Sequence, residues 1–158
     1  MKRIILSIVA VLFAASTFAQ IENLKVGGGL TYGTEVSAIG LNINGVYTIT
    51  DEIDGAITFT HFFEDLPTWN VLDLEGHYTF TEVGDGIGIY GLAGFGITFW
   101  SVDLGIFGKT TGSSTGVNLG AGAKIGINDN LSIAPEAKFT IGSDYNYFRL
   151  GAAVLYSF

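Results

Sequence analysis

The chain has 158 residues and no cysteine, and its seven basic residues against fifteen acidic ones give a formal net charge of −8. The lack of cysteine excludes disulfides and thiolate metal sites. The acidic balance argues against nucleic acid as a partner, because nucleic acid needs a basic surface to displace its counterions. The 23 glycines are scattered along the chain, and glycine at this density opposes helix. The composition therefore favours an all-β protein.

The first segment, residues 1–19, has the layout of a secretory signal peptide. Lys2 and Arg3 precede an apolar run over 4–15, and a small-x-small pattern over 17–19 predicts cleavage after Ala19. The run is shorter than the roughly 20 residues that a membrane-spanning helix needs. We therefore expect an exported chain whose mature part, residues 20–158, is a single domain with five basic and fifteen acidic residues.

Seven breaks divide this mature part. Three are short clusters of Asp, Asn and Gly at 50–55, 82–86 and 128–130, which favour tight hairpin turns because these residues tolerate left-handed backbone conformations. Four looser breaks, at 34–37, 64–69, 101–114 and 142–146, alternate with them. The segments between the breaks predict eight strands, at 24–33, 38–49, 55–63, 70–81, 87–100, 115–127, 131–141 and 147–158. Most are close to the nine to eleven residues that a tilted membrane-spanning strand uses, and longer than the five or six common in soluble sandwiches.

Apolar and polar residues alternate along these segments. In the fourth, one face carries Leu72, Leu74, Gly76, Tyr78 and Phe80, and the other carries Asp73, Glu75, His77 and Thr79. Either a soluble lipocalin-like barrel with its apolar face inside or a membrane barrel with its apolar face outside produces this alternation. The polar faces of the later segments are mostly Gly, Ala, Ser and Thr with isolated charges, which suits the narrow interior of an eight-stranded barrel better than a water-exposed exterior.

Charges inside such a barrel must be paired, because an unpaired buried charge costs several kcal/mol. We predict a charge network in the lumen, with Arg149 directed towards acidic partners such as Glu136 on the preceding segment. The alternative is a set of unconnected surface charges. The predicted members of the network are Asp73, Glu75, His77, Lys124, Glu136, Lys138 and Arg149.

Glycines and aromatic residues add two weaker expectations. Gly88, Gly94 and Gly96 leave room for longer lumen side chains from the strands opposite. Two sets of aromatic residues fall near the strand ends, as two interfacial girdles would place them. The turn-side set is Tyr47, Tyr78, Phe80, Tyr156 and Phe158, and the loop-side set is Phe63, Trp69, Phe99, Trp100, Tyr145 and Tyr147.

The last segment alternates up to a terminal aromatic, Phe158, and its apolar face reads Phe148, Leu150, Ala152, Val154, Tyr156 and Phe158. This pattern resembles the closing strand of bacterial outer-membrane barrels, where it is the signal read by the barrel-assembly machinery. The residues at the matching places are Leu150, Val154, Tyr156 and Phe158. As the eighth strand, this segment must also pair with 24–33 to close the sheet.

Over 24–158 the pattern resembles the small eight-stranded outer-membrane β-barrel family, the OmpX-like or OmpA-type transmembrane domain. The resemblance implies an antiparallel up-and-down transmembrane β-barrel in the bacterial outer membrane. It also implies a monomer surrounded by outer-membrane lipid and lipopolysaccharide, with no cofactor and no metal. Its role would be structural or in surface interaction, and not that of a wide pore, because conducting porins use sixteen or more strands.

Two other functions remain open: a lipid-modifying outer-membrane enzyme, as some members of this family are, and a lipocalin-like soluble ligand-binding barrel. For the enzyme, His77 lies two positions from Glu75 on the same predicted face, although such a pair inside a barrel is more often a structural hydrogen bond. His61 precedes Glu64 and Asp65, a set that is more often plain solvated charge than a metal site. We therefore predict that the protein is not an enzyme.

Overall fold

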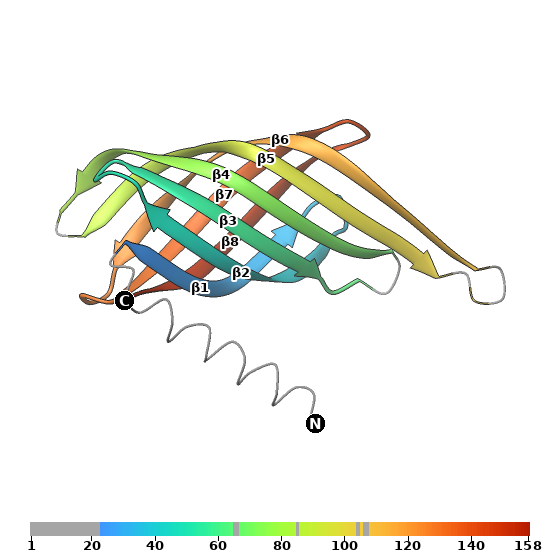
Figure 1. Ribbon diagram of the computed structural model, residues 1–158, viewed down its shortest axis with the longest axis horizontal. Coiled ribbons are helices and arrows are strands. Elements are labelled where there is room, and N and C mark those ends of the chain that lie inside the picture. The colour runs from blue at the N-terminus through green and yellow to red at the C-terminus, as the bar shows by residue number, and fades with distance from the viewer. Residues whose placement is uncertain (1–22, 65–66, 85, 104, 106–107) are drawn as a thin grey trace, which may run out of the picture.

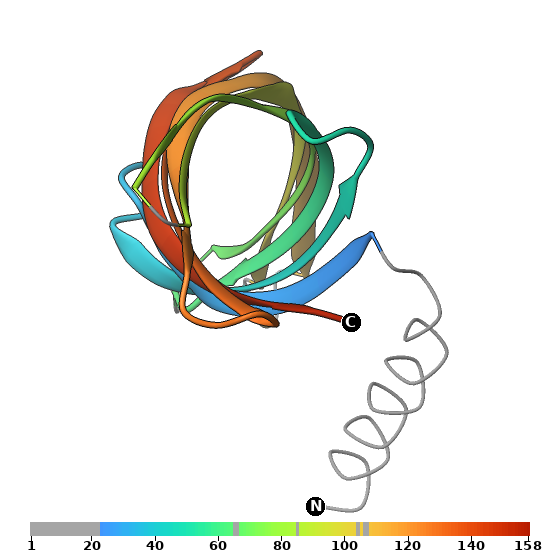
Figure 2. The same ribbon diagram turned by 90° about the vertical axis from the view of Figure 1, so that its left-hand side faces the viewer.

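The computed structural model describes residues 23–64, 67–84, 86–103, 105 and 108–158, so the predicted signal peptide lies outside the described residues. Within them, eight antiparallel strands follow one another around a closed barrel (Figures 1 and 2). Their bounds are β1 (Leu24–Gly33), β2 (Ala38–Thr48), β3 (Ile53–Phe62), β4 (Thr68–Val83), β5 (Ile87–Asp103), β6 (Lys109–Gly126), β7 (Leu131–Gly142) and β8 (Asn146–Ser157). The predicted fold class and strand count are confirmed. Among the described residues, no helix is long and apolar enough to cross a membrane.

The barrel closes between its first and last strands, as predicted. The β1–β8 ladder runs from Lys25 opposite Ser157 to Gly33 opposite Arg149. Two glycines of β1 allow the close approach of β8, since a Cβ at Gly27 would collide with the carbonyl oxygen of Val154, and one at Gly29 with that of Ala152. This seam therefore depends on the absence of side chains at two positions of β1.

The register fixes the tilt of the strands. Following paired residues once around the barrel leads through Gly122, Glu136, Gly151, Thr31, Gly40, Phe62, Trp69, Trp100 and back to β6 at Gly112. The path starts at Gly122 and returns to the same strand at Gly112, ten residues away. A shear of ten over eight strands corresponds to a tilt of about 40°, so each residue advances about 2.5 Å along the barrel axis.

Side chains are distributed inside out relative to a soluble protein. On β2, Ile43 is 58% exposed on the outer face, whereas Asn42 and Asn44 are buried in the lumen. The outward apolar side chains from Ile39 to Ile49 span about 25 Å along the axis, the height of the apolar band of a membrane barrel. A lipocalin-like soluble barrel, with its apolar side chains inside, does not fit this distribution.

The largest difference from the predicted connections lies between β5 and β6. The connections over 49–52, 84–86 and 127–130 lie at the end of the barrel where the C-terminus lies, and those over 34–37, 63–67, 104–108 and 143–145 lie at the other end, so the two kinds of break alternate as expected (Figure 1). The strand bounds leave only three to five residues for each connection, so the turns and the looser breaks are of similar length. The expected loop over 101–114 is wrong, because β5 continues to Asp103 and β6 already begins at Lys109. The Ser, Thr and Gly residues of this stretch resemble a loop in composition, yet they pair across the β5–β6 ladder from Ser101 opposite Thr111 outwards. The resulting β5–β6 hairpin extends beyond the rest of the barrel (Figure 1).

Candidate functional site

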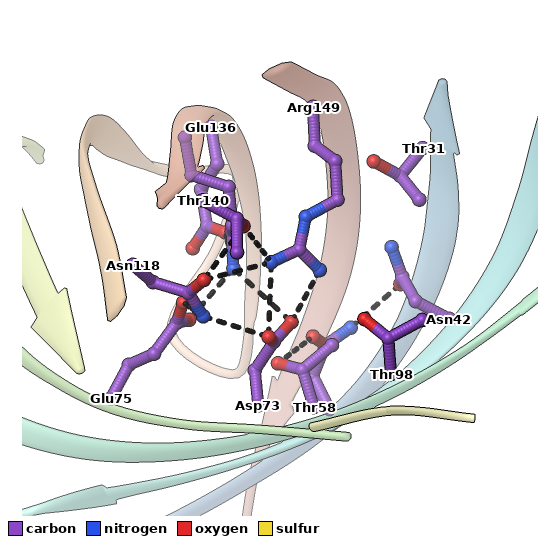
Figure 3. A network of polar contacts seen from close by, with 12 residues as sticks. Thr31, Asn42, Thr58, Asp73, Glu75, Thr98, Asn118, Glu136, Thr140 and Arg149 are labelled. Carbon is purple, nitrogen blue, oxygen red and sulfur yellow. Dashed lines mark hydrogen bonds and ion pairs between the residues drawn. The ribbon is translucent and has the colours of Figure 1, made fainter. Parts of the chain in front are cut away.

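The centre of the lumen is an ion pair between β8 and β4. The Nη1 of Arg149 lies 2.6 Å from the Oδ2 of Asp73, and its Nη2 lies 3.0 Å from the Oδ1 of the same carboxylate (Figure 3). The exposed fraction is 2% for Arg149 and 0% for Asp73. A bidentate geometry of this kind fixes both side chains, and it links strands on different sides of the barrel.

Neutral side chains form hydrogen bonds to this ion pair. The Nδ2 of Asn118, on β6, donates to the Oδ1 of Asp73 at 2.7 Å and to the Oε1 of Glu75 at 2.8 Å. Its Oδ1 accepts from the Oγ1 of Thr140 at 2.7 Å and from the Nη2 of Arg149 at 3.2 Å. The side-chain amide of Asn118 therefore both donates and accepts hydrogen bonds, and it joins the charged residues into one network (Figure 3).

Lys138 is the second cation of the network. Its Nζ lies 2.7 Å from the Oε2 of Glu75, 3.4 Å from the Oε2 of Glu136 and 3.9 Å from the Oδ2 of Asp73. The hydroxyl of Tyr90 donates to the Oε1 of Glu136 at 2.7 Å. Three carboxylates thus share two cations, and the hydroxyl of Tyr90 and the amide of Asn118 supply further donors.

Two glycines of β5 make room for this network. A Cβ at Gly94 would collide with the backbone of β4 at Leu74, and one at Gly96 would lie 2.8 Å from the Oδ1 of Asp73. Glycine therefore leaves room at both positions, but the space is taken by the β4 backbone at Gly94 and by the side chains of Asp73 and Asn118, from the neighbouring strands, at Gly96. The expectation that side chains from the strands opposite fill it is wrong. At Gly88 a Cβ would lie 3.5 Å from the Cγ2 of Thr79, an ordinary contact, so the prediction is wrong there.

Lys124 lies apart from the central network, near the turn end. Its Nζ is 2.6 Å from the Oδ2 of Asp54, whose Oδ1 accepts from the Oγ1 of Thr48 at 2.6 Å. Lys25, on β1, donates to the same Thr48 hydroxyl at 2.9 Å. Of the residues predicted to form one network, the structure brings together Asp73, Glu75, Glu136, Lys138 and Arg149 and places Lys124 in a second group.

His77 stacks on Tyr90, with ring centroids 4.8 Å apart and planes 9° apart. Its Nε2 lies 3.9 Å from the Oε2 of Glu75, beyond hydrogen-bonding distance, and the ring is buried in the lumen. No arrangement of a nucleophile with an oriented base is formed around it in the part of the chain that the structure describes.

His61 points outwards, and its Nδ1 donates to the Oδ1 of Asn70 at 2.8 Å. Asp65, the other carboxylate considered beside Glu64, lies outside the described residues. In the described ranges, no group of three or more His, Asp or Glu side chains is placed to hold a metal ion.

Apolar side chains close the lumen above and below the charged layer. The loop-end cluster consists of Phe62, Trp69 and Val71, with Val36, Trp100 and Tyr145 packed against it. The turn-end cluster consists of Val46, Ala56, Ala134, Ala153 and Leu155. Trp69 and Tyr147 are buried inside the barrel, and Trp100 and Tyr145 pack on the loop-end cluster. The expectation that these four aromatics belong to an outer interfacial girdle is therefore wrong.

The closed ring, the strand tilt and the exposed apolar band define the protein as an eight-stranded transmembrane β-barrel. No family model matches the chain, and no curated protein matches it. Solved structures do. The N-terminal β-barrel domain of Pseudomonas aeruginosa OprF matches with a TM-score of 0.74 at 19% identity, covering 87% of this chain and 98% of that chain. Neisserial surface protein A matches with a TM-score of 0.64 at 17% identity, covering 85% and 96%.

Ail, the attachment invasion locus protein of Yersinia pestis, matches with a TM-score of 0.60 at 16% identity, covering 86% of this chain and 97% of that chain. A de novo designed transmembrane β-barrel matches with a TM-score of 0.57, also at 16% identity. At these identities the likeness establishes the fold. Because a designed barrel shares it, the fold by itself does not specify a biological activity.

Proposed function

We propose that the protein is an integral barrel of the bacterial outer membrane, with a lumen closed to solutes and a structural or surface-interaction role. The observation that carries this proposal is the inverted distribution of side chains, with an apolar band outside and a paired ionic layer inside. The fold shared with OprF, Ail and Neisserial surface protein A supports the outer-membrane location.

Three features support a closed lumen. The ionic layer around Arg149 crosses the barrel, and the loop-end and turn-end clusters lie on either side of it. Two cavities among these layers have volumes of about 20 Å³ each. A volume of this size holds about one water molecule, far less than a continuous aqueous path requires.

Conductance in planar lipid bilayers tests the closed lumen. The purified protein is expected to give no stepwise channels of porin size, because ions would have to separate the buried charge pairs. A sixteen-stranded porin reconstituted in the same bilayers serves as the positive control. Regular openings of comparable size from the folded protein would contradict the proposal.

The β5–β6 hairpin supports a surface-interaction role. The ladder between β6 and β7 starts at Gly116 opposite Gly142, so Lys109–Ser114 pair with β5 alone. The carbonyl oxygen of Thr115 accepts from the N–H of Ser143 on the β7 side. By alternation, Thr111 and Ser113 direct their backbone groups to that same open side. An edge of this kind can pair with an extended segment of another chain.

Labelling of intact cells tests which end of the barrel faces outwards. The chain has no cysteine, so Lys109→Cys introduces a single thiol near the tip of the hairpin. A membrane-impermeant maleimide added to whole cells is expected to label it. Asn130→Cys, in the β6–β7 turn at the other end, is the matched control and is expected to react only after the cells are lysed. The reverse pattern would contradict the proposed orientation.

The outer surface of the barrel also indicates which partners the protein contacts. We propose that lipid and lipopolysaccharide surround the apolar band, and that the outward face of β8 meets the barrel-assembly machinery during insertion. On this face, Leu150, Val154 and Tyr156 are 45–57% exposed, and the rings of Tyr156 and Phe158 pack edge to face. A monomer is the proposed state, because the closed ladder leaves no open strand edge within the apolar band.

A further inference from the structure

A groove of about 520 Å³ lies on the outer wall of the barrel, at the loop end of β4, β5 and β6. The outward side chains that line it are Asn70, Phe99, Ser101, Thr111 and Ser113, and Trp100 and Gly112, whose positions face the lumen, complete the lining. They are neighbours across the ladder, since Asn70 pairs with Phe99, Phe99 with Ser113, and Ser101 with Thr111. The groove is therefore formed by regular sheet and not by a loop.

The groove crosses the upper boundary of the apolar band. The next outward residue towards the membrane is Leu72 below Asn70 on β4. On β6 the outward residues change from Thr115 to Val117, which is 42% exposed. On β5, Phe99 is the last apolar residue of the band before Ser101. In a membrane, these positions face the headgroup layer of the outer leaflet if the loop end is external.

The lining offers hydrogen bonds without charge. Three hydroxyls and one amide surround the ring of Phe99, which is 44% exposed, and no charged side chain lines the groove. The Oδ1 of Asn70 accepts from the Nδ1 of His61, so the Nδ2 of Asn70 is the group that can donate into the groove. A phosphate would require a cation here, whereas an acyl chain would leave the hydroxyls without partners.

The geometry points to a binding site for a neutral sugar of an outer-leaflet glycolipid. The C–H face of a sugar ring packs on an aromatic ring, and its hydroxyls exchange hydrogen bonds with serine, threonine and asparagine side chains. A sugar held at this place would also orient the base of the β5–β6 hairpin. The inference rests on the proposed function, because it requires the loop end to lie outside the cell.

Titration of the isotopically labelled barrel in phosphatidylcholine nanodiscs tests the site. The probe is the soluble core oligosaccharide released from rough lipopolysaccharide by mild acid, followed by shifts of backbone amide resonances. Saturable shifts are expected at residues 99–101 and 111–113. Phe99→Leu and Ser113→Ala are each expected to weaken binding at least threefold. Phe95→Leu, on the same strand and 69% exposed within the apolar band, is the matched control and is expected to bind as the unchanged protein does.

Two results would overturn the inference. One is the absence of saturable shifts at the groove, or an affinity that Phe99→Leu leaves unchanged. The other is the same shifts when phosphatidic acid, which carries a phosphate and acyl chains but no sugar, is added to the nanodiscs, since contact would then be made through phosphate or acyl chains. If Lys109→Cys is labelled on intact cells and either result is found, the inference fails while the proposed orientation stands. Failure of the labelling itself would contradict both.

Discussion

Gly29→Ala is expected to prevent the barrel from closing. A Cβ at this position would collide with the backbone of β8 at Ala152, and no change of rotamer can relieve the contact, because the backbone fixes the position of the Cβ. The seam between β1 and β8 would have to separate locally. Each N–H or C=O left unpaired in hydrocarbon costs several kcal/mol, so the folded barrel should lose most of its stability.

Migration on gels without boiling measures this effect, because a folded barrel resists the detergent and moves differently from the boiled chain. Gly76→Ala is the matched control, since a Cβ there would lie 3.9 Å from the carbonyl oxygen of Ala93, an ordinary contact. We expect the control to fold as the unchanged chain does and Gly29→Ala to yield little or no folded band. Equal folded fractions for the two variants would show that the seam tolerates a side chain.

Arg149→Leu is expected to destabilise the folded barrel by about 3–5 kcal/mol, the loss found when one partner of a buried ion pair is removed. Asp73 would remain fully buried with only the more distant Lys138 as a cation, at 3.9 Å. Asn118 and Thr140 would also lose their contacts to the guanidinium. The urea concentration at the midpoint of unfolding, measured in lipid vesicles, should fall accordingly.

A second variant separates the lost pair from a simple packing defect. Arg149→Leu combined with Asp73→Asn removes both charges, so no uncompensated carboxylate remains in the lumen. We expect the double variant to recover at least half of the lost stability, because an unpaired buried charge destabilises the fold more than the absence of both charges does. Lys109→Leu, at the exposed hairpin tip, is the control and should leave the midpoint unchanged. An unchanged midpoint in Arg149→Leu, or a double variant no more stable than the single one, would contradict a coupled network.

The seven breaks in the sequence were enough to predict the number of strands and their order, and alternation was enough to predict the polar face of the fourth and the later strands. It could not predict the partners across the lumen, because these depend on the register and on the shear of ten residues. Arg149 was expected near acidic residues such as Glu136 on the neighbouring strand, yet it pairs with Asp73 on β4. Neutral Asn118 was not predicted to belong to the network, because its side chain carries no charge, although it lies on the polar face of its strand and hydrogen-bonds Asp73.

Two further errors have physical causes. Asp54 was assigned to a turn, but β3 begins at Ile53, which places its carboxylate in the lumen beside Lys124. Trp69 and Tyr147 were assigned to the lipid interface by their position near strand ends. Their parity within the strands, shared with Asp73 and Arg149, directs them inwards, and this parity was the stronger signal.

The central claim is that the apolar face of every strand meets lipid and the polar face lines the lumen. Because the chain has no cysteine, single cysteines at Leu41, Asn42, Ile43 and Asn44 of β2 can each carry a nitroxide label in reconstituted vesicles. Collisions with oxygen, which concentrates in the bilayer, and with a water-soluble nickel complex then report the surroundings of each label. We predict high oxygen accessibility and low nickel accessibility at positions 41 and 43, and low accessibility to both at 42 and 44. High nickel accessibility at 41 and 43 would contradict a membrane-spanning barrel.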